Sequence, residues 1–329
     1  MPLGLGLASS HAPGMWRPWQ KWPEALERRP PEIRNHLPYT AKVEMESDEI
    51  REDYYNRIHG AFANLRSQLE AYRPDALIMI GDDQGDMYDE ANNPIFSIYT
   101  GDEPSWGRRP TGDIEAPIEQ REVLHFPQHG ELARFLQKGL VKKGFDVANA
   151  AKFEPRGNPI RGISHMVSAP LPALNPALDI PLVNVFINEY YPPLPSAERC
   201  AALGEAIADL CNARPERIAI YASGGLSHFP GEFNVGWIDT ALDHWILERL
   251  ERGDVEALKH LFTFDSINMR AGTGEVRAWI AVAAAMKRGC KVLDYVPAHC
   301  TVTGCGFVYW PPVDSLIDEA SRIASGVSV

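Results

Sequence analysis

The stretch that decides the fold is Ala76-Leu-Ile-Met-Ile-Gly-Asp-Asp-Gln84, an apolar run that ends in a glycine, two carboxylates and an amide. A short apolar run bounded by turn-forming residues is typical of a strand that is buried on both faces of a parallel sheet. Ligands of such sheets bind beyond the carboxyl ends of the strands. We therefore expect Asp82, Asp83 and Gln84 to lie at the edge of a functional site.

Predicted strands and helices alternate along most of the chain. The expected strands are 3–8, 76–80, 95–99, 145–150, 182–187, 218–222 and 307–310, and the expected helices are 47–72, 129–143, 195–212, 238–250, 255–261, 274–287 and 313–325. Residues 14–46 and 101–120 are expected to be mainly loop. This alternation predicts an α/β fold: one domain over residues 1–329, with a mostly parallel central sheet flanked by helices on both faces.

Composition narrows the class of protein further. The 329 residues carry a formal net charge of -12 without a cluster of Lys and Arg, which argues against binding to nucleic acid. The five cysteines are odd in number and lack metal-type spacing, so we expect reduced thiols and a cytoplasmic protein. The N-terminus has no signal-peptide pattern, and no apolar run is long enough to span a membrane.

Polar residues follow four of the predicted strands. These segments are Ser9-Ser10-His11, Asp82-Asp83-Gln84, Asn188-Glu189-Tyr190-Tyr191 and Ser223-Gly224-Gly225-Leu226-Ser227-His228. Each segment alone is compatible with an ordinary turn or helix cap. Because the strand ends should converge at one edge of the sheet, two histidines together with carboxylates and amides favour a divalent metal site or acid–base chemistry.

Several spaced motifs between about residues 11 and 310 occur in an order typical of one family. They are Ser9-Ser10-His11-Ala12-Pro13, Ile163-Ser164-His165, Tyr191-Pro192-Pro193 with Arg199-Cys200 and Ala202-Leu203-Gly204, Gly224-Gly225-Leu226-Ser227-His228, and Gly272-Thr273-Gly274-Glu275 with Trp279. In these motifs the chain resembles the class III extradiol ring-cleavage dioxygenases of the protocatechuate 4,5-dioxygenase beta-subunit type.

The resemblance implies a set of roles. The family binds non-haem Fe(II) through two histidines and a carboxylate, which leaves positions open for the substrate and O2. By motif position, His11 is the first metal ligand and Glu275 the carboxylate. His228 is the acid–base histidine, and His165 hydrogen-bonds the substrate or the bound oxygen. The implied substrate is a catechol-like or aminophenol-like ring, and Mn(II) or another divalent metal is the alternative to Fe(II).

The second metal histidine of the family is absent at its motif position, where this chain has Gln84. Three interpretations stay open. Gln84 or a neighbouring aspartate binds the metal through oxygen; His59, on the preceding helix, supplies the second imidazole; or the site binds metal poorly and performs other chemistry. We rank His59 ahead of Gln84, because Fe(II) at an oxygenase site favours imidazole.

Two other functions compete with a dioxygenase. A hydrolase or C–C lyase would use His228, His165 and the aspartates as acid–base groups without O2. A non-catalytic binding subunit would not need His11, His165, His228 and Glu275 together. Trp16, Trp19 and Trp22 and the tyrosines 190 and 191 are candidates for the wall of an aromatic pocket. A homodimer is the expected assembly, because symmetric dimers are the commonest soluble oligomers.

Overall fold

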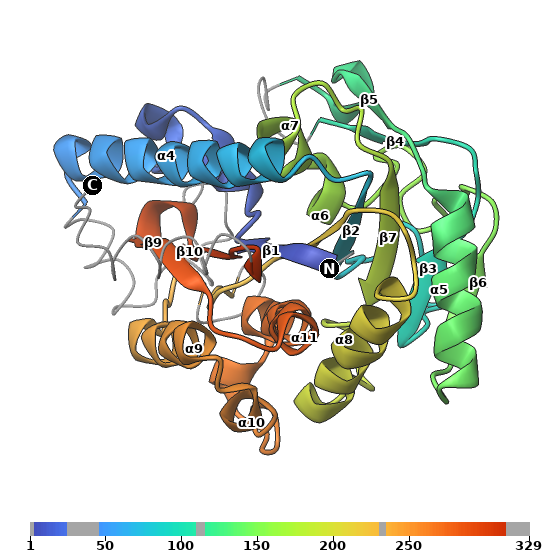
Figure 1. Ribbon diagram of the computed structural model, residues 1–329. Helices are drawn as coiled ribbons and strands as arrows, with labels where there is room; N and C mark the ends of the chain where they lie inside the picture. Colours follow the sequence, from blue (N-terminus) through green and yellow to red (C-terminus); the bar gives the residue numbers. More distant parts are fainter. Residues whose placement is uncertain (1–2, 25–45, 110–115, 230–234, 314–329) are drawn as a thin grey trace.

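The computed structural model describes residues 3–24, 46–109, 116–229 and 235–313. Eight strands form one mixed sheet in the order β6-β3-β7-β2-β8-β1-β10-β9, and β4 and β5 form a separate antiparallel pair. Figure 1 shows this sheet in the middle of the molecule, with α4 above it and α8, α9 and α11 below it in this view. The predicted α/β fold with a mostly parallel sheet flanked by helices is confirmed.

The bounds of the elements are as follows. The strands are β1 Leu3–Ser9, β2 Ala76–Gly81, β3 Phe96–Tyr99, β4 Ser105–Arg108, β5 Val123–Phe126, β6 Val147–Ala150, β7 Leu182–Ile187, β8 Ile218–Ser223, β9 Lys291–Ala298 and β10 Thr303–Trp310. The α-helices are α4 Asp48–Tyr72, α5 Gly130–Lys142, α6 His165–Ser168, α7 Leu171–Leu174, α8 Ala197–Cys211, α9 Thr240–Arg252, α10 Val255–Leu258 and α11 Val276–Met286. Short 3-10 turns include η1 Pro13–Trp16 and η5 Ala271–Glu275.

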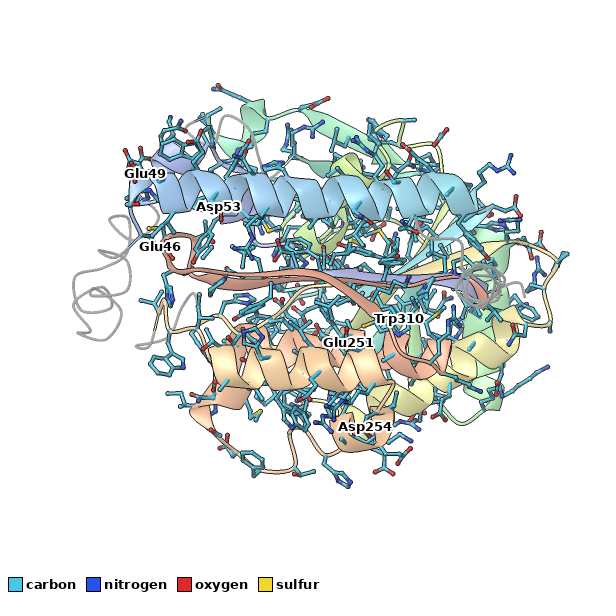
Figure 2. The ribbon with its side chains drawn as sticks, turned by 60° about the vertical axis from the view of Figure 1, so that its left-hand side comes forward. Glu46, Glu49, Asp53, Glu251, Asp254 and Trp310 are labelled. Carbon is cyan, nitrogen blue, oxygen red and sulfur yellow. The ribbon has the colours of Figure 1, made fainter. Side chains whose placement is uncertain are left out.

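Strand β2 lies inside the sheet, where β7 and β8 pair with it in parallel. Ile78 and Ile80 face the core layer that contains α5, α8, α9 and α11, whereas Leu77 and Met79 face the layer that contains α4 and α7. All four side chains are fully buried, as expected for a strand covered on both faces. Figure 2 shows the sheet almost edge-on, with α4 on one side and α9 on the other.

Helix α4 begins and ends close to where the sequence predicts. The hydroxyl of Ser47 accepts a hydrogen bond from the Ile50 amide, which satisfies one of the free donors at the helix start. The expected apolar stripe of Ile58, Phe62, Leu65 and Leu69 is buried. Glu46, labelled in Figure 2, accepts the amides of His299 and Cys300 and so ties the helix start to the turn after β9.

Three features were not predicted. Strand β4 lies inside the segment expected to be loop, and its partner β5 was not expected either. Strand β9, at the edge of the main sheet, is half-buried and contains Pro297, so its sequence lacks the continuous apolar run of an inner strand. The short helices α6 and α7 carry too few residues for a recognisable period. The helix predicted over 313–325 lies outside the described residues, apart from its first residue.

Two smaller expectations concern the cysteines and the membrane. All five cysteines are buried and free of disulfide bonds. Among the helices that the structure describes, none combines the length and the apolar character that crossing a bilayer requires.

Candidate active site

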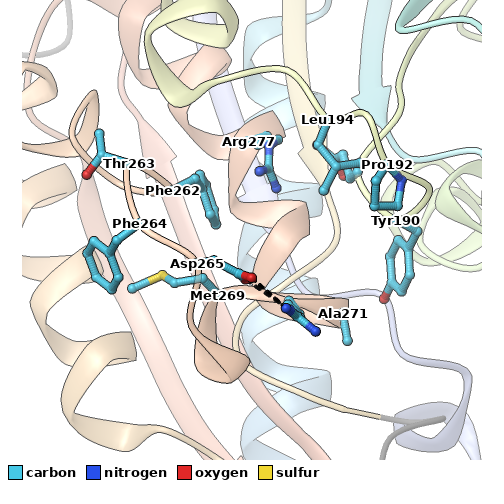
Figure 3. A pocket seen from close by; sticks show the side chains of 12 residues that line it. Tyr190, Pro192, Leu194, Phe262, Thr263, Phe264, Asp265, Met269, Ala271 and Arg277 are labelled. Carbon is cyan, nitrogen blue, oxygen red and sulfur yellow. Dashed lines mark hydrogen bonds and ion pairs between the residues drawn. The ribbon is translucent and has the colours of Figure 1, made fainter.

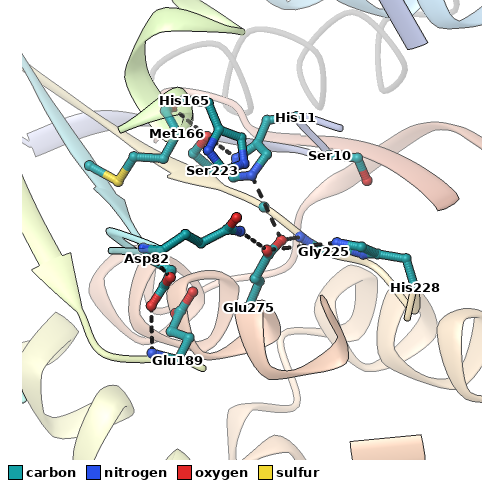
Figure 4. Close-up of polar contacts among 12 residues, drawn as sticks. Ser10, His11, Asp82, His165, Met166, Glu189, Ser223, Gly225, His228 and Glu275 are labelled. Carbon is teal, nitrogen blue, oxygen red and sulfur yellow. Dashed lines mark hydrogen bonds and ion pairs between the residues drawn. The ribbon is translucent and has the colours of Figure 1, made fainter. Parts of the chain in front are cut away.

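The carboxyl ends of four neighbouring strands meet at one edge of the sheet, as the sequence predicts. His11 follows β1, Gln84 follows β2, Tyr190 follows β7 and His228 follows β8, while Glu275 comes from the turn η5 directly before α11. Figure 4 shows side chains from these segments pointing toward Glu275. Strand register explains the convergence, because Ser223 at the end of β8 lies between Ser9 of β1 and Gly81 of β2.

The tautomer of His11 follows from its hydrogen bonds. Nδ1 of His11 lies 2.8 Å from the hydroxyl of Ser223, and that hydroxyl donates its proton to the carbonyl of Met166 at 2.6 Å. Because a hydroxyl carries one proton and the carbonyl can only accept, Nδ1 of His11 must donate to Ser223. Burial and the nearby imidazoles of His165 and His228 hold the pKa of His11 well below its usual value. The ring is therefore neutral, and its Nε2 atom carries a lone pair.

Nε2 of His11 is buried and has no hydrogen-bond partner. It points toward Glu275, whose Oε2 atom is 4.0 Å away. A first-row metal ion binds such ligands at about 2 Å, so the gap has room for an ion between the two atoms. A buried unpartnered nitrogen costs stability, and it is explained if the site normally holds an ion or ligand there.

Glu275 is fully buried and accepts hydrogen bonds on both oxygens. Oε2 accepts the amide of Gly225, and Oε1 accepts the hydroxyl of Tyr190 and the side-chain amide of Gln84, each at 2.7 Å. The backbone of Gly224 approaches the carboxylate so closely that a Cβ atom there would lie 2.6 Å from Oε2. Its φ of +131° also suits glycine alone, so both observations explain the glycine pair of the motif.

Gln84 is held in the left-handed region of backbone space, with φ at +49°. This conformation is uncommon for a residue with a side chain and is typically kept where surrounding contacts enforce it. Here the carboxylate of Asp82 accepts the Gln84 amide at 2.5 Å, and the side chain of Gln84 reaches Glu275. The structure therefore brings Gln84 into the site.

His59 lies elsewhere. Its ring contacts the rings of Tyr55 and Trp16, with centroid separations of 4.1 and 5.8 Å. The charged groups that influence His11 are His165 and His228, and His59 is not among them. Burial lowers the pKa of His59, as expected for an imidazole in an aromatic environment. Nε2 of His59 is buried without a hydrogen-bond partner, as that of His11 is, but the ring contacts of His59 are with these aromatic side chains, whereas Gln84 contacts Glu275.

His228 and Tyr190 form a pair next to Glu275. Nδ1 of His228 lies 2.8 Å from the carbonyl of Leu226 and must donate to it, which leaves Nε2 as the reactive nitrogen. That nitrogen is 3.4 Å from the hydroxyl of Tyr190 and 3.7 Å from Oε1 of Glu275. Burial, and secondarily Glu275, raises the pKa of Tyr190 well above its usual value, so its hydroxyl stays protonated.

Asp243 supports the loop that carries His228 through hydrogen bonds. This carboxylate accepts the amide and the hydroxyl of Ser227 at 2.9 and 2.8 Å and the hydroxyl of Tyr295 at 2.6 Å. On its other side, the ring of His228 abuts Gly272, where a Cβ atom would lie 2.0 Å from the ring. The imidazole is thus positioned from both sides.

His165 occupies the wall opposite His228. Its ring meets the ring of His11 edge-on, with centroids 4.6 Å apart, and its Nδ1 atom is buried without a hydrogen-bond partner. The nearest carboxylate oxygen is Oδ2 of Asp86 at 3.8 Å. The structure thus brings His11, His165, His228, Glu275 and Gln84 together and leaves His59 apart.

Three carboxyl groups crowd the site and influence one another. Asp82, Glu189 and Glu275 are all buried. Burial, together with neighbouring carboxylates that include Glu275, raises the pKa of Asp82 and of Glu189 well above the usual values. Burial also raises the pKa of Asp83 to about 7, although its carboxylate accepts the amides of Met87 and Tyr88 at 2.9 Å. Asp83 thus shapes the loop after β2.

The donor set fits a divalent metal in part. His11 offers a free nitrogen lone pair, Glu275 offers a carboxylate, and Gln84 has an amide within reach of that carboxylate. Within the described ranges, no three His, Cys, Asp or Glu side chains are arranged to hold a metal ion. The amide of Gln84, which contacts Glu275, is one candidate for a third protein ligand.

Two residues of the strand-end segments have roles in the site that the sequence did not indicate. Ser223 sets the tautomer of His11, but a serine at the end of a strand has no distinctive signal. Tyr190 was expected only as part of an aromatic wall, yet its hydroxyl contacts both Glu275 and His228. Trp16 and Trp22 pack instead beside α4, against Phe62 and Tyr55 respectively.

Comparison with known families agrees with this geometry. Residues 35–307 match the family model described as the catalytic LigB subunit of aromatic ring-opening dioxygenase. The match covers most of the chain. The protein belongs to this family of ring-opening dioxygenase subunits.

Individual relatives are more distant. The chain is 28% identical over 199 residues to a 2,3-dihydroxyphenylpropionate/2,3-dihydroxicinnamic acid 1,2-dioxygenase of Klebsiella pneumoniae, covering 60% of this chain and 55% of the relative. It is 28% identical over 182 residues to the protein of the same name from Escherichia coli K12, covering 54% and 51%. The chain thus spans about half the length of the curated relatives it matches. The crystal structure of an uncharacterized Escherichia coli K12 protein is similar with a TM-score of 0.49 and 13% identity, over 93% of this chain and 99% of that one.

Proposed function

We propose that this chain is an extradiol dioxygenase, which uses O2 to open the ring of a catechol-like or aminophenol-like substrate beside its two adjacent heteroatoms. Membership of the ring-opening dioxygenase family supports the reaction class. The observation that carries the proposal is the unpartnered Nε2 atom of His11, which faces the carboxylate of Glu275 across 4.0 Å.

We propose Fe(II) as the metal, with Mn(II) or another divalent ion as the alternative. His11, Glu275 and the amide oxygen of Gln84 would hold it, and the side chain of Gln84 would turn so that its oxygen replaces its nitrogen. When bound, the metal supplies open coordination positions at which the substrate heteroatoms and O2 are brought together.

Side chains of the protein transfer protons and position the substrate and O2. Nε2 of His228 takes a proton from a substrate hydroxyl and returns it later, the general acid–base role that imidazole commonly has. The Tyr190 hydroxyl, 3.4 Å from this nitrogen, donates to Glu275 in this structure and would stabilise the substrate oxygen by turning its proton toward it. His165 hydrogen-bonds the substrate or O2 from the opposite wall. All three side chains are mostly shielded from solvent, so bulk water competes little with these bonds.

The alternative of a hydrolase or C–C lyase on the same scaffold is not favoured. It was motivated by the absent second histidine, whereas the family to which the chain belongs is one of ring-opening dioxygenases. Gln84 also offers an oxygen ligand at the place of that histidine.

Oxygen uptake tests the proposal. The protein is reconstituted with Fe(II) without air, and uptake is then measured with a panel of catechols and aminophenols. The panel includes 2,3-dihydroxyphenylpropionate, for which the relatives are named. We expect uptake together with a new ring-opened chromophore. The absence of uptake with every substrate, in protein shown to contain metal, would contradict the proposal.

Metal content of two variants tests the third ligand. We expect Gln84→Ala to lose most of its Fe(II), while His59→Ala keeps it, because the contacts of His59 are with Trp16 and Tyr55. Loss of Fe(II) from His59→Ala but not from Gln84→Ala would support His59 as the third ligand, the order inferred from the sequence.

We further propose that the protein is a homodimer and that it is located in the cytoplasm. Light scattering during gel filtration measures the oligomeric state.

A further inference from the structure

A second cavity adjoins the candidate active site. It has a volume of about 730 Å³ and is bordered by the loop after β7, the segment from Phe262 to Ala271, and the first turn of α11. Figure 3 shows Arg277 and Phe262 on its inner wall and Tyr190 on its rim. Tyr190 also contacts Glu275, so one side chain separates this cavity from the site described above.

Arg277 is an uncompensated buried cation in this wall. Only 4% of the residue is exposed, and its guanidinium lies 3.8 Å from the centroid of the Phe262 ring. Its Nε atom donates to the carbonyl of Pro195 at 2.7 Å, and its Nη1 atom donates to the carbonyl of Gly274 at 3.1 Å. Within the described part of the chain, no carboxylate lies within ion-pair distance of it, and its Nη2 atom has no hydrogen-bond acceptor.

A buried guanidinium of this kind needs an acceptor. Burial lowers the pKa of Arg277, yet arginine keeps its charge in proteins. A buried charge that lacks a paired anion is costly, and arginine suits the planar geometry of a carboxylate. Two of the five guanidinium protons have acceptors, and one proton on Nη1 and two on Nη2 do not. Because Arg277 lines the cavity, the missing anion would lie there.

Glu189 is the nearest candidate for a protein counter-charge, and its surroundings disfavour that role. Only 1% of the residue is exposed, and neither carboxyl oxygen has a hydrogen-bond partner. Within the described part of the chain no ion pair joins Glu189 to Arg277, whose side-chain hydrogen bonds go to the carbonyls of Pro195 and Gly274 instead. Glu189 therefore does not serve as the direct partner of the guanidinium.

We propose that this cavity binds the carboxylate substituent of the aromatic substrate, with Arg277 as its counter-charge. The inference rests on the proposed function in one respect, because it assumes that the ring to which the carboxylate is attached lies beside Tyr190 in the active site. The mostly apolar neighbours Leu194, Phe262 and Met269 would cover the linker between ring and carboxylate.

Calorimetric titration with unreactive probes tests the cavity alone. The probes are 3-phenylpropionate, its neutral amide and 2-phenylethylamine, which differ in charge but not in ring. We expect the acid to bind the full-length protein about tenfold to hundredfold more tightly than the amide, the effect of a hydrogen-bonded ion pair. Arg277→Gln should abolish this preference, and Arg277→Lys should keep part of it.

Arg199→Gln is a matched control. Arg199 also lies over a phenyl ring, 4.0 Å from the centroid of Phe145, and also donates to a backbone carbonyl, but it does not line the cavity. We expect its acid preference to equal that of the unaltered protein. Because Arg277→Gln also removes contacts that support the start of α11, Leu194→Trp provides a second variant, which fills the cavity and should weaken the binding of acid and amide alike.

Three results would overturn the inference. Equal binding of acid and amide to the unaltered protein would show that Arg277 recognises no anion. Tightest binding of the amine would show that Glu189 is ionised and that the cavity binds cations instead. The probes need neither metal nor O2, so failure of ring cleavage leaves this test intact. Conversely, ring cleavage of a carboxylated catechol with unchanged KM in Arg277→Gln would overturn the carboxylate site alone.

Discussion

The two ends of the parallel strands differ in how their polar groups are hydrogen-bonded. At the amino end, Asp75 before β2 and Arg217 before β8 exchange backbone and side-chain hydrogen bonds, at 2.8 Å in each direction. Arg288 donates to the carbonyl of Gly4 in β1 at 2.8 Å. At the carboxyl end, His11, His165 and Glu189 all keep buried polar atoms without partners.

This difference indicates that polar groups at the amino end mainly stabilise the fold, whereas those at the carboxyl end mainly serve binding and catalysis. Unpaired buried polar atoms cost free energy of folding, and native proteins keep few of them. Those of His11, His165 and Glu189 lie at the carboxyl edge, where parallel sheets bind ligands, so these three groups are candidates for ligand contacts. Substitutions at the carboxyl end should therefore alter binding and catalysis with little loss of stability, whereas those at the amino end should do the reverse.

The largest effect is expected for Glu275→Gln. The change keeps the shape of the side chain but removes the charge opposite His11, so we expect ring cleavage to fall by more than about a hundredfold and metal content to fall with it. The new amide nitrogen cannot accept a hydrogen bond as the oxygen it replaces does, but one charge also leaves a crowded group of carboxyls, so we expect the melting temperature to change little. Oxygen uptake, metal analysis and calorimetry measure the three quantities. A large fall in melting temperature would contradict the comparison.

Ser223→Ala should weaken metal binding by about tenfold to a hundredfold, the usual effect of removing a group that orients a ligand. Without the hydroxyl, Nδ1 of His11 loses the acceptor that keeps its proton on that atom. Equilibrium dialysis with Mn(II) measures the affinity. Ser97→Ala, at another fully buried strand serine, should leave the affinity unchanged. Equal losses in both variants would show that Ser223 has no specific orienting role.

Asp243→Asn should alter how stability depends on pH. Burial raises the pKa of Asp243 to about 7, whereas in the unfolded chain this group titrates near 4. Between these values the folded protein binds more protons than the unfolded chain, so the contribution of Asp243 to the free energy of unfolding falls as pH rises from about 4 to about 7. Removing this titration should reduce the fall between pH 5 and pH 7 by about 2 kcal/mol.

Urea denaturation at pH 5, 6 and 7 measures this slope. Asp209→Asn is the control, because this carboxyl is exposed, and the slope should match that of the unaltered protein. An unchanged slope in Asp243→Asn would refute the raised pKa assigned to Asp243. Because Asp243 supports Ser227, the same variant should also reduce the activity that depends on His228.

The smallest effect is expected at the amino end. Arg217→Ala removes a side chain that donates to the Tyr72 carbonyl and lies 4.7 Å from the centroid of the Tyr72 ring. The site is exposed, so we expect a loss of about 1 kcal/mol in the free energy of unfolding. Metal affinity should stay unchanged. A change in metal affinity without a change in the free energy of unfolding would show that this residue at the amino end serves binding rather than stability, contrary to the comparison of the two ends.

Local patterns predicted most of the sheet and much of the site. Runs such as Ala76–Ile80 and Leu182–Ile187 are apolar because both of their faces are covered, so they could be recognised from composition alone. His11, His165, His228 and Glu275 came from motifs, and the structure brings them together. The edge strand β9 and the pair β4 and β5 were missed, because partly exposed strands with proline or glycine lack that signal.

The choice between Gln84 and His59 as a metal ligand illustrates what could not be predicted from the sequence. The preference of Fe(II) for imidazole favoured His59, yet the orientation of α4 places that ring beside Trp16 and Tyr55. The left-handed backbone at Gln84 and its contact with Glu275 could not be inferred from the residue types. Residue chemistry indicates which groups can bind a metal, but it does not indicate which of them reach it.

The sequence by itself determined the α/β fold and the identity of most groups at the carboxyl edge, because apolar runs and strand-end motifs are local properties. Tertiary structure alone decided three further features. These are the tautomer of His11, set by Ser223; the contact of Tyr190 with Glu275 and His228; and the unbalanced charge of Arg277 in the adjoining cavity. Each depends on distances between segments far apart in the chain, and hydrogen bonding and burial act through those distances rather than through sequence order.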